Sequence, residues 1–485
     1  MRLSKSYLDL GEAFYERSDT KAFPAPELLL FNHELAESLG ITGESTSLAS
    51  LLSGQETLGE LQPVALAYAG HQFGHFNPSL GDGRAHYIGE LQDQSGKLWE
   101  LQLKGSGPTP FSRGGDGLCG IGPAVREFIM SAALTGLGLP TTRSLSVVTT
   151  GEKIFRQGPS DGAVVSRVAS SHIRIGTFQY FAYHGDTNSL KQLADYSLQR
   201  HFPDVDQETQ SATPGERYSA LLRAVVQKQA YLISEWMRVG FIHGVMNTDN
   251  CTLSGDTIDF GPCAMLGIYD PATVYSSIDA QGRYAFGNQP SIALWNLTRF
   301  AECLIPIIDA AKPDKAAALL EPIVLSFNKE YKNHYRKMIG KKMGFMENDE
   351  TVLKLSQEWL ELLQTHKLDY TQSFRLLNQQ IQGAPIESTP ADLRAFIQRW
   401  KKEIEKQDHA ITDIQKCLDS SNPYIIPRNH LVEKAIKACE DDHDTQPALS
   451  LIEALRAPYD QNAKTEVFDE IPEDGDAGYK TFCGT

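Results

Sequence analysis

The chain has few cysteines, and their arrangement argues against the scaffolds that cysteines usually build. Only seven occur in 485 residues; the number is odd, they are scattered, and no two form a Cys-x-x-Cys pair. This spacing disfavours a zinc ribbon and the disulfide framework of a small secreted domain. A chain of this length buries roughly three quarters of its surface on folding, so it needs neither a disulfide nor a structural metal for stability.

The sequence also lacks an excess of positive charge and a long apolar run. Its formal net charge is −16, which argues against a nucleic-acid or anionic-membrane binder, because both need a basic surface. The longest largely apolar run, residues 128–140, is too short to span a bilayer, and the N-terminus has no signal-type segment. We therefore expect a cytoplasmic protein without a nucleic-acid or membrane partner, in which any site for an anion is locally basic.

The composition changes along the chain, without internal repeats. Residues 1–60 are expected to form an N-terminal arm with a short helix near Asn32–Leu39. Residues 61–185 are rich in Gly, Val, Thr and Ile, and their alternating or β-branched runs predict strands. These runs are YIGELQ, LWELQLK, SLSVVTTGE and AVVSRVAS. One predicted helix, over residues 122–138, interrupts them, with Pro123 in its first turn.

Helices are expected to dominate residues 186–485. The clearest covers Gly215–Val239, where apolar residues recur at helical spacing, and Gly240 ends it. The acidic stretches 440–444 and 469–476 are expected to belong to a solvated tail. A β-rich lobe followed by a larger helical lobe predicts an α+β, protein-kinase-like two-lobed fold.

The stretch HGVMNTDNCTLSGDTIDFG, residues 243–261, is close to the catalytic loop of a kinase. Kinase-type enzymes place a base two residues after the His, then an Asn metal ligand, then a metal-binding Asp in Asp-Phe-Gly. Here Asn250 and Asp259 occupy the metal positions, but Val245 stands where the base would be. Residues 251–260 are expected to form a hairpin that turns at its Ser-Gly pair.

Two residues upstream extend the kinase-like pattern. Lys104 ends a predicted strand, and Glu127 lies in the helix that follows. In a kinase the strand Lys holds phosphate oxygens and the helix Glu holds the Lys. Either residue alone is most often an ordinary surface residue, but their order before Asn250 and Asp259 makes the pair informative.

Two glycine-rich segments are candidates for nucleotide contacts. The segment with Gly81, Gly83 and Arg84 lies where a kinase keeps its phosphate loop, and an arginine there can grip phosphate bidentately; alternatively it is a plain hairpin turn. Residues 105–124 hold seven glycines and three prolines. This composition predicts a flap over the nucleotide, with Asp116-Gly117 near it, or else a lid that makes no ligand contact.

Arg167 and Arg174 add positive charge in an otherwise apolar and small-residue context. Together with Lys104 and Arg84 they could bury the β- and γ-phosphates of a nucleotide and leave the α-phosphate facing the acceptor. Asp249, next to the expected metal ligand, can act as the base that Val245 cannot. On this interpretation the transferred group is AMP and not phosphate.

The combination of these segments resembles the selenoprotein O family. The match is dense over about residues 65–300 and weaker, though collinear, to the C-terminus. The motifs are YAGHQFGHFNPSLGDGRAHYIGE, LQLKGSGPTPFSRGGDGL, REFIMSAALTGLGLPTTRSLSVV, SRVASSHIRIGTFQYF, GFIHGVMNTDN and TIDFGPCAML. The resemblance implies a kinase-like fold that binds ATP in a flipped orientation and transfers AMP to Ser, Thr or Tyr hydroxyls of proteins.

The resemblance also implies roles for individual residues. Asp249 would be the proton acceptor, and Asn250 and Asp259 would be ligands of Mg²⁺ or Mn²⁺. Glu127 would be the ion-pair partner of Lys104. The nucleotide contacts would be Gly81, Gly83, Arg84, Lys104, Asp116, Gly117, Arg167, Arg174 and Asp259.

The end of the chain carries a further implied feature. Eukaryotic members of the family have selenocysteine near the C-terminus, where this chain has Cys483, as in bacterial members. Redox regulation through Cys483 is therefore a hypothesis, and the sequence indicates no partner cysteine.

Two other functions stay open at this point. One is a kinase that transfers the γ-phosphate, which Val245 argues against. The other is a nucleotide-binding scaffold without catalysis. The joint presence of both metal-ligand candidates and the Lys/Glu pair argues against a scaffold, because a scaffold needs none of them together. The sequence does not decide between ATP and UTP as donor in the presence of Mn²⁺.

Overall fold

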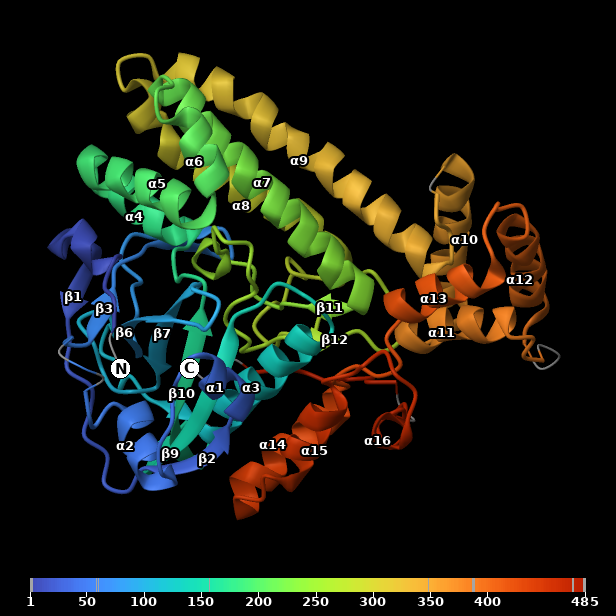
Figure 1. The fold of residues 1–485 in the computed structure, drawn as a ribbon, viewed down its shortest axis with the longest axis horizontal. Helices are drawn as coiled ribbons and strands as arrows, with labels where there is room; N and C mark the ends of the chain where they lie inside the picture. Colours follow the sequence, from blue (N-terminus) through green and yellow to red (C-terminus); the bar gives the residue numbers. More distant parts are fainter. Residues whose placement is uncertain are drawn as a thin grey trace.

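The computed structural model describes residues 3–57, 59, 61–156, 158–347, 349–385, 389–472 and 475–482 (Figure 1). Its strands are β1 (Tyr15–Arg17), β2 (Glu27–Phe31), β3 (Val64–Leu66), β4 (Gly70–Gln72), β5 (His75–Asn77), β6 (Ala85–Gln92), β7 (Leu98–Lys104), β8 (Cys119–Gly120), β9 (Arg143–Phe155), β10 (Pro159–Ala169), β11 (Phe241–Ile242) and β12 (Ala264–Met265). The main sheet is antiparallel and runs in the order β1-β3-β6-β7-β10-β9-β2, with β8 paired to β10. β4 pairs with β5, and β11 pairs with β12.

Helices cover the sheet and build most of the second half of the chain. They are α1 (His33–Ser38), α2 (Ser45–Ser53), α3 (Ile121–Gly136), α4 (Ile175–His184), α5 (Thr187–His201), α6 (Pro203–Thr209), α7 (Pro214–Val239), α8 (Gln289–Asp309), α9 (Pro313–Lys342), α10 (Glu350–His366), α11 (Tyr370–Ile381), α12 (Ala391–Ile404), α13 (Ile411–Ser421), α14 (Asn429–Asp442), α15 (Gln446–Ala454) and α16 (Ala463–Glu466). This composition of helices and antiparallel sheet is an α+β fold, and its β-rich part followed by a helical part agrees with the predicted two-lobed plan.

The pleat of β7 and β10 separates core residues from site residues. Successive side chains of a strand point to opposite faces. Leu101 and Leu103 of β7 pack in the cluster beneath α2, whereas Gln102 and Lys104 face the other way. Arg167 of β10 is the register partner of Gln102. The period of two along these strands therefore puts two cations on one face of the sheet.

The caps of α7 fix where this helix begins and ends, and the predicted catalytic loop follows directly after it. α7 starts with a capping box formed by Thr213 and Glu216, and it ends at Gly240, whose φ of +77° suits glycine. Figure 1 shows α7 and α9 running side by side, and α8 packs against both. The loop after Gly240 thus begins at a rigid helical layer, which fixes its direction.

The strand and helix predictions for the first half of the chain are confirmed. β6, β7 and β9 contain three of the predicted runs, β10 contains the fourth except for its last residue, Ser170, and α3 covers the predicted helix up to Gly136, two residues before its predicted end. The short helix near Asn32–Leu39 is α1, in which the side chain of Asn32 accepts a hydrogen bond from the Leu35 amide. These predictions succeed because their signals are local.

The predicted hairpin over residues 251–260 is wrong. Thr252 forms an isolated bridge with Arg174, and Thr257 forms one with Thr141. The chain still bends at Gly255, whose φ is +79°, but each side of the bend pairs with a different neighbouring segment. The Ser-Gly pair did indicate a turn. The segments that pair with residues 252 and 257 lie far away in the chain, so the sequence pattern could not indicate them.

The prediction of a solvated acidic tail is only partly right. Residues 441–444 are exposed, but the first of them belong to α14. Beyond residue 475 the described chain is docked: the Thr481 amide donates to Tyr275 O at 2.8 Å, and Thr481 Oγ1 donates to Pro262 O at 2.7 Å. Thr481 therefore packs directly behind the Asp-Phe-Gly segment.

The division of the chain at residues 60 and 185 stays a prediction. Residue 185 is a glycine that ends α4 in the left-handed conformation. β1 and β2, which precede residue 60, both pair within the main sheet.

One helix among the described residues, Phe286–Asp309, is long and apolar enough to span a membrane by length and composition. It includes α8, which packs against α4, α7 and α9. A buried core helix passes the same test, so the finding is weak evidence for a membrane span.

Candidate active site

One cavity brings the predicted site residues together. It has a volume of about 530 Å³ and lies between the sheet, the glycine-rich segments and the loop that follows α7. Every residue predicted to bind nucleotide or metal, or to act as base, lines it: Gly81, Gly83, Arg84, Lys104, Asp116, Gly117, Arg167, Arg174, Asp249, Asn250 and Asp259. Convergence of eleven residues from four separate sequence segments onto one cavity makes it the candidate active site.

The predicted Lys/Glu ion pair is present and is part of a larger network. Lys104 Nζ lies 2.7 Å from Glu127 Oε2. Arg167 reaches the same carboxylate, with Nη2 at 2.7 Å from Glu127 Oε1, and both side chains are almost fully buried. Burial alone would raise the pKa of Glu127, but the charges of Arg167 and Lys104 hold it below its usual value. Glu127 therefore stays charged and fixes two cations at the back of the cavity.

Asp259 is held by three cations. Its Oδ1 lies 3.0 Å from Lys104 Nζ and 2.5 Å from Arg167 Nη2, and its Oδ2 lies 3.0 Å from Arg174 Nη1. Burial acts to raise the pKa of Asp259, but the three cations hold it well below the usual range. Its backbone has φ +63°, a left-handed conformation that is costly for a non-glycine residue. The carboxylate is therefore ionised and tightly oriented.

Asp249, the predicted base, is a buried carboxylate at the cavity wall. It is 8% exposed, and its Oδ1 has no hydrogen-bond partner among the described residues. The pKa of Asp249 is raised to about 6. Burial is the main cause, and it outweighs the opposing effects of Arg174 and of a side-chain hydrogen bond from Gln72. Arg174 Nη1 also donates to the backbone O of Asp249 at 2.8 Å. A carboxylate that lines the cavity and has a pKa near neutrality can take a proton from a substrate.

Asn250 and Asp259 form a donor set that fits a hard divalent cation. Asn250 Nδ2 donates to Val245 O at 2.9 Å, which leaves its Oδ1 as the atom able to bind a metal. Within the part of the chain that the structure describes, no group of three or more His, Cys, Asp or Glu is arranged to hold a metal by itself. One carboxylate and one amide oxygen suit Mg²⁺, which usually takes its other ligands from water and substrate phosphates.

The two glycine-rich segments pack against each other at the cavity wall. A Cβ on Gly81 would lie 2.1 Å from the Phe111 ring, and one on Gly117 would lie 2.2 Å from the backbone of Gly107. Ser112 Oγ donates to Gly83 O. Close packing therefore requires glycine at Gly81 and Gly117 whether or not a nucleotide binds, and contacts of these glycines with nucleotide stay a prediction.

Asp116 has a protein partner that the sequence did not suggest. Arg156, from the end of the β9–β10 hairpin, donates to both carboxylate oxygens at 2.9 Å. This pair lowers the pKa of Asp116 and pins the flap to the sheet. Arg156 lines the same cavity and was missed because nothing in its local sequence distinguishes it.

Sequence reasoning missed further cavity residues. Asp82 is buried, accepts a hydrogen bond from Gln102 Nε2 at 2.7 Å and lies 3.9 Å from Arg174. Tyr68 stacks under Arg174, with 4.6 Å between the guanidinium carbon and the ring centre. Asp82 lies inside the quoted Gly-Asp-Gly-Arg segment, so its acidity was a usable signal. Tyr68 offered no comparable signal.

A larger cavity, of about 930 Å³, lies between α9 and α10. None of the predicted site residues lines it. Its lining combines leucines with lysines and polar groups and contains no paired catalytic side chains, so we assign the chemistry to the smaller cavity.

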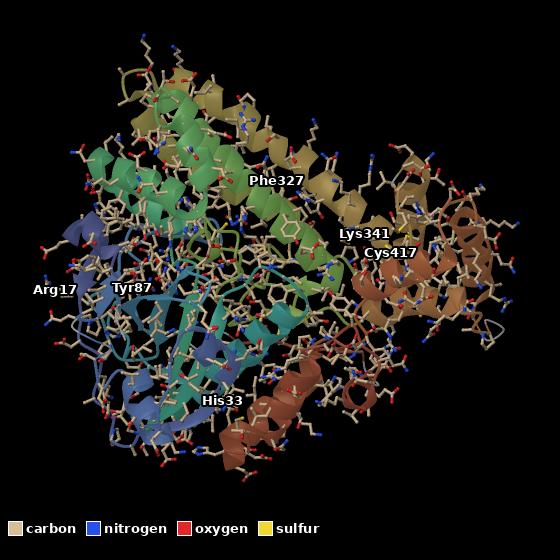
Figure 2. All side chains as sticks on the ribbon, viewed as in Figure 1. Arg17, His33, Tyr87, Phe327, Lys341 and Cys417 are labelled. Atoms are coloured by element: carbon tan, nitrogen blue, oxygen red, sulfur yellow. The ribbon has the colours of Figure 1, made fainter. Side chains whose placement is uncertain are left out.

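The cysteines of the described residues are unsuited to reaction at this site. Cys119, Cys251, Cys263, Cys303 and Cys439 are buried. Cys417 is partly exposed, and Figure 2 shows it beside Lys341 at the far end of α9, away from the sheet. Cys483 lies outside the described residues, so the redox hypothesis stays a prediction.

Because Gly70 has no side chain, the Asp249 carboxylate can pack directly against its backbone. A Cβ at this position would lie 2.7 Å from Asp249 Oδ1 and 2.9 Å from Leu80 Cδ1. Gly70→Ala should therefore displace the carboxylate and lower the transfer rate about 10²-fold, since a misplacement of about 1 Å can cost that much. Transfer kinetics and ATP affinity should be measured separately, and ATP affinity should change little.

The matched control is Gly43→Ala, whose Cβ would make an ordinary 3.5 Å contact with Leu48. Equal rates for the two alanine variants would mean that the position of Asp249 does not limit transfer.

Comparisons with known proteins agree on one family. The model of the family "Protein adenylyltransferase SelO" matches residues 1–456. A protein nucleotidyltransferase YdiU of Teredinibacter turnerae is 47% identical over 490 residues, which cover all of both chains. The proteins of the same name from Pseudoalteromonas translucida and Bacillus cereus are 44% and 45% identical, over all of this chain and 100% and 98% of theirs.

Proposed function

Because the chain belongs to the SelO family of protein adenylyltransferases and is a protein nucleotidyltransferase, we propose that it transfers AMP from ATP to Ser, Thr or Tyr hydroxyls of proteins. We further propose that ATP binds with its β- and γ-phosphates deepest in the cavity. The observation that carries this proposal is the placing of Asp249. It is a carboxylate that lines the cavity with a pKa raised to about 6, and it would replace the base that Val245 cannot supply.

The distribution of positive charge supports the flipped nucleotide. Lys104, Arg167 and Arg174 meet at the inner wall, and Arg174 Nε is buried without a hydrogen-bond partner among the described residues. A buried guanidinium with an unused donor is suited to a phosphate oxygen. With the outer phosphates held there, the α-phosphate would lie toward the catalytic loop.

The proposed reaction is a displacement at the α-phosphorus. The acceptor hydroxyl oxygen attacks, and Asp249 takes the hydroxyl proton. A new O–P bond forms, the bond between the α-phosphorus and the bridging oxygen breaks, and pyrophosphate leaves with the electron pair. Mg²⁺ or Mn²⁺, held by Asn250 and Asp259, would neutralise charge on the phosphate oxygens.

The experiment that tests this function compares two labels. The enzyme is incubated with a protein acceptor and ATP labelled at either the α- or the γ-phosphate. We expect only the α-label to become protein-bound, together with release of pyrophosphate, and mass spectrometry should find the added mass of AMP on a hydroxyl side chain.

Transfer of the γ-label with accumulation of ADP would instead identify a kinase with an unusual base. Binding of ATP without transfer of either label would identify a scaffold. Repeating the α-label experiment with UTP and Mn²⁺ decides whether UMP is also transferred.

A further inference from the structure

The β4–β5 hairpin forms part of the cavity rim next to Asp249. The His71 amide donates to Thr248 Oγ1 at 2.7 Å, and the Phe73 amide donates to Asn247 Oδ1 at 3.1 Å. Phe73 adopts φ +51° at the tip, a conformation that is unfavourable for a bulky residue. The hairpin is therefore fastened to the catalytic loop in a strained shape that presents Phe73 to the cavity.

The segment after the Asp-Phe-Gly supplies the facing part of the rim. Ile278 lines the same cavity and is 52% exposed. Asp279 accepts hydrogen bonds from the amides of Arg283 and Tyr284, at 2.9 and 2.7 Å. Tyr284 donates its hydroxyl to Asn247 Oδ1 at 2.6 Å. Both sides of the rim thus converge on Asn247, two residues before Asp249.

Arg283 lies next to this rim, and stacking contacts hold it there. Its guanidinium carbon lies 4.8 Å from the Trp295 ring centre and 5.7 Å from that of Tyr284. It also lies 3.8 Å from where a Cβ on Gly74 would be, directly against the hairpin tip. Stacking fixes the plane of the guanidinium. One of its donors also bonds to the Tyr284 side chain, and its remaining N–H groups can bind an anion.

The charge of Arg283 is not matched within the described residues. No Asp or Glu side chain among them forms an ion pair with it, and its Nε is buried without a hydrogen-bond partner. The guanidinium carbon of Arg299 also lies near the Trp295 ring, 5.2 Å from its centre, but Arg299 is paired with Glu302 at 2.7 Å. A half-buried arginine that lacks an anion is unusual in a protein of net charge −16.

We propose that Arg283 selects the protein acceptor by binding an Asp or Glu side chain that flanks the modified hydroxyl. Phe73 and Ile278 contact the apolar part of the same acceptor segment. The inference rests on the proposed function, since it assumes that the acceptor hydroxyl meets Asp249. The planar fork of arginine matches a carboxylate bidentately, which gives direction as well as charge.

The test reverses the charge at residue 283 and measures AMP transfer to peptides with different flanking residues. Peptides with one hydroxyl residue and a fixed Glu, Ala or Lys at each flanking position are incubated with α-labelled ATP. The unaltered enzyme should prefer Glu over Ala at one position by about tenfold in kcat/KM. Arg283→Glu should reverse the preference toward Lys at that position, and Arg283→Gln should remove it.

Arg336→Glu, on α9 and outside the candidate active site, is the matched control and should keep the Glu preference. Thermal unfolding and ATP binding of each variant separate loss of folding from loss of selection. An unaltered enzyme indifferent to flanking acids, or an Arg283→Glu variant with unchanged preference, would overturn the inference. If the γ-label and not the α-label is transferred, the proposed function fails, and the same peptides with γ-labelled ATP still report on Arg283.

Discussion

Replacing Asp249 by asparagine should leave ATP binding close to that of the unaltered enzyme and slow AMP transfer by about 10²–10⁴. Asparagine keeps the shape of the side chain in its buried position but cannot accept the hydroxyl proton. Removal of a negative charge next to the phosphates cannot weaken nucleotide binding electrostatically. The measurements are single-turnover transfer from α-labelled ATP and, separately, the dissociation constant of ATP.

The control adds an acid where a kinase would have one. Val245→Asp in the Asp249→Asn background should not restore transfer, because a carboxylate at residue 245 would face another phosphate of the flipped nucleotide. Recovery of activity in this double variant would show that the base works from the kinase position.

The same residue predicts the pH dependence. Burial raises the pKa of Asp249 to about 6, and only the charged form accepts a proton. The kcat/KM of the unaltered enzyme should therefore be level above pH about 6 and fall about tenfold per pH unit below it, because this parameter reports groups of the free enzyme. The residual activity of Asp249→Asn should lack this acid limb.

Replacing Arg174 by alanine should lower transfer by about 10³–10⁵, the range seen for phosphate-directed arginines, and should also weaken ATP binding. Arg174 contacts Asp259 Oδ2 at 3.0 Å and the backbone O of Asp249 at 2.8 Å. Its loss removes a charge from the proposed phosphate site and a support of the proposed base together. Arg174→Lys should recover only part of the activity, since lysine cannot make both contacts.

The appropriate controls are arginines that face solvent. Arg336 and Arg399 pair with exposed glutamates, and their alanine variants should transfer AMP at nearly the unaltered rate. Arg167 and Arg174 both pair with buried carboxylates, and losing such a partner costs about 3–5 kcal/mol of stability. Thermal unfolding of the Arg174→Ala variant therefore separates loss of folding from loss of phosphate binding. Equal small effects of Arg174→Ala and Arg336→Ala would mean that Arg174 does not bind phosphate.

The sequence by itself determined the local structure and the set of chemical groups. The strand over residues 98–104, the helix over 122–138 and the end of α7 at Gly240 follow from periods and caps that act within a few residues. The motifs likewise located Lys104 and Asp259 as parts of a site, because their spacing to neighbouring glycines and polar residues is itself local information.

Only the tertiary structure decided which groups meet. Asp259 contacts Lys104 across 155 positions, and Asp116 is engaged by Arg156. The predicted hairpin at 251–260 fails because its pairing partners, Thr141 and Arg174, come from other segments. Such contacts depend on how sheets and helices pack, for which no local period exists. The same packing places Arg283 against the hairpin tip without an acidic partner among the described residues, a property that no reading of neighbouring residues could have revealed.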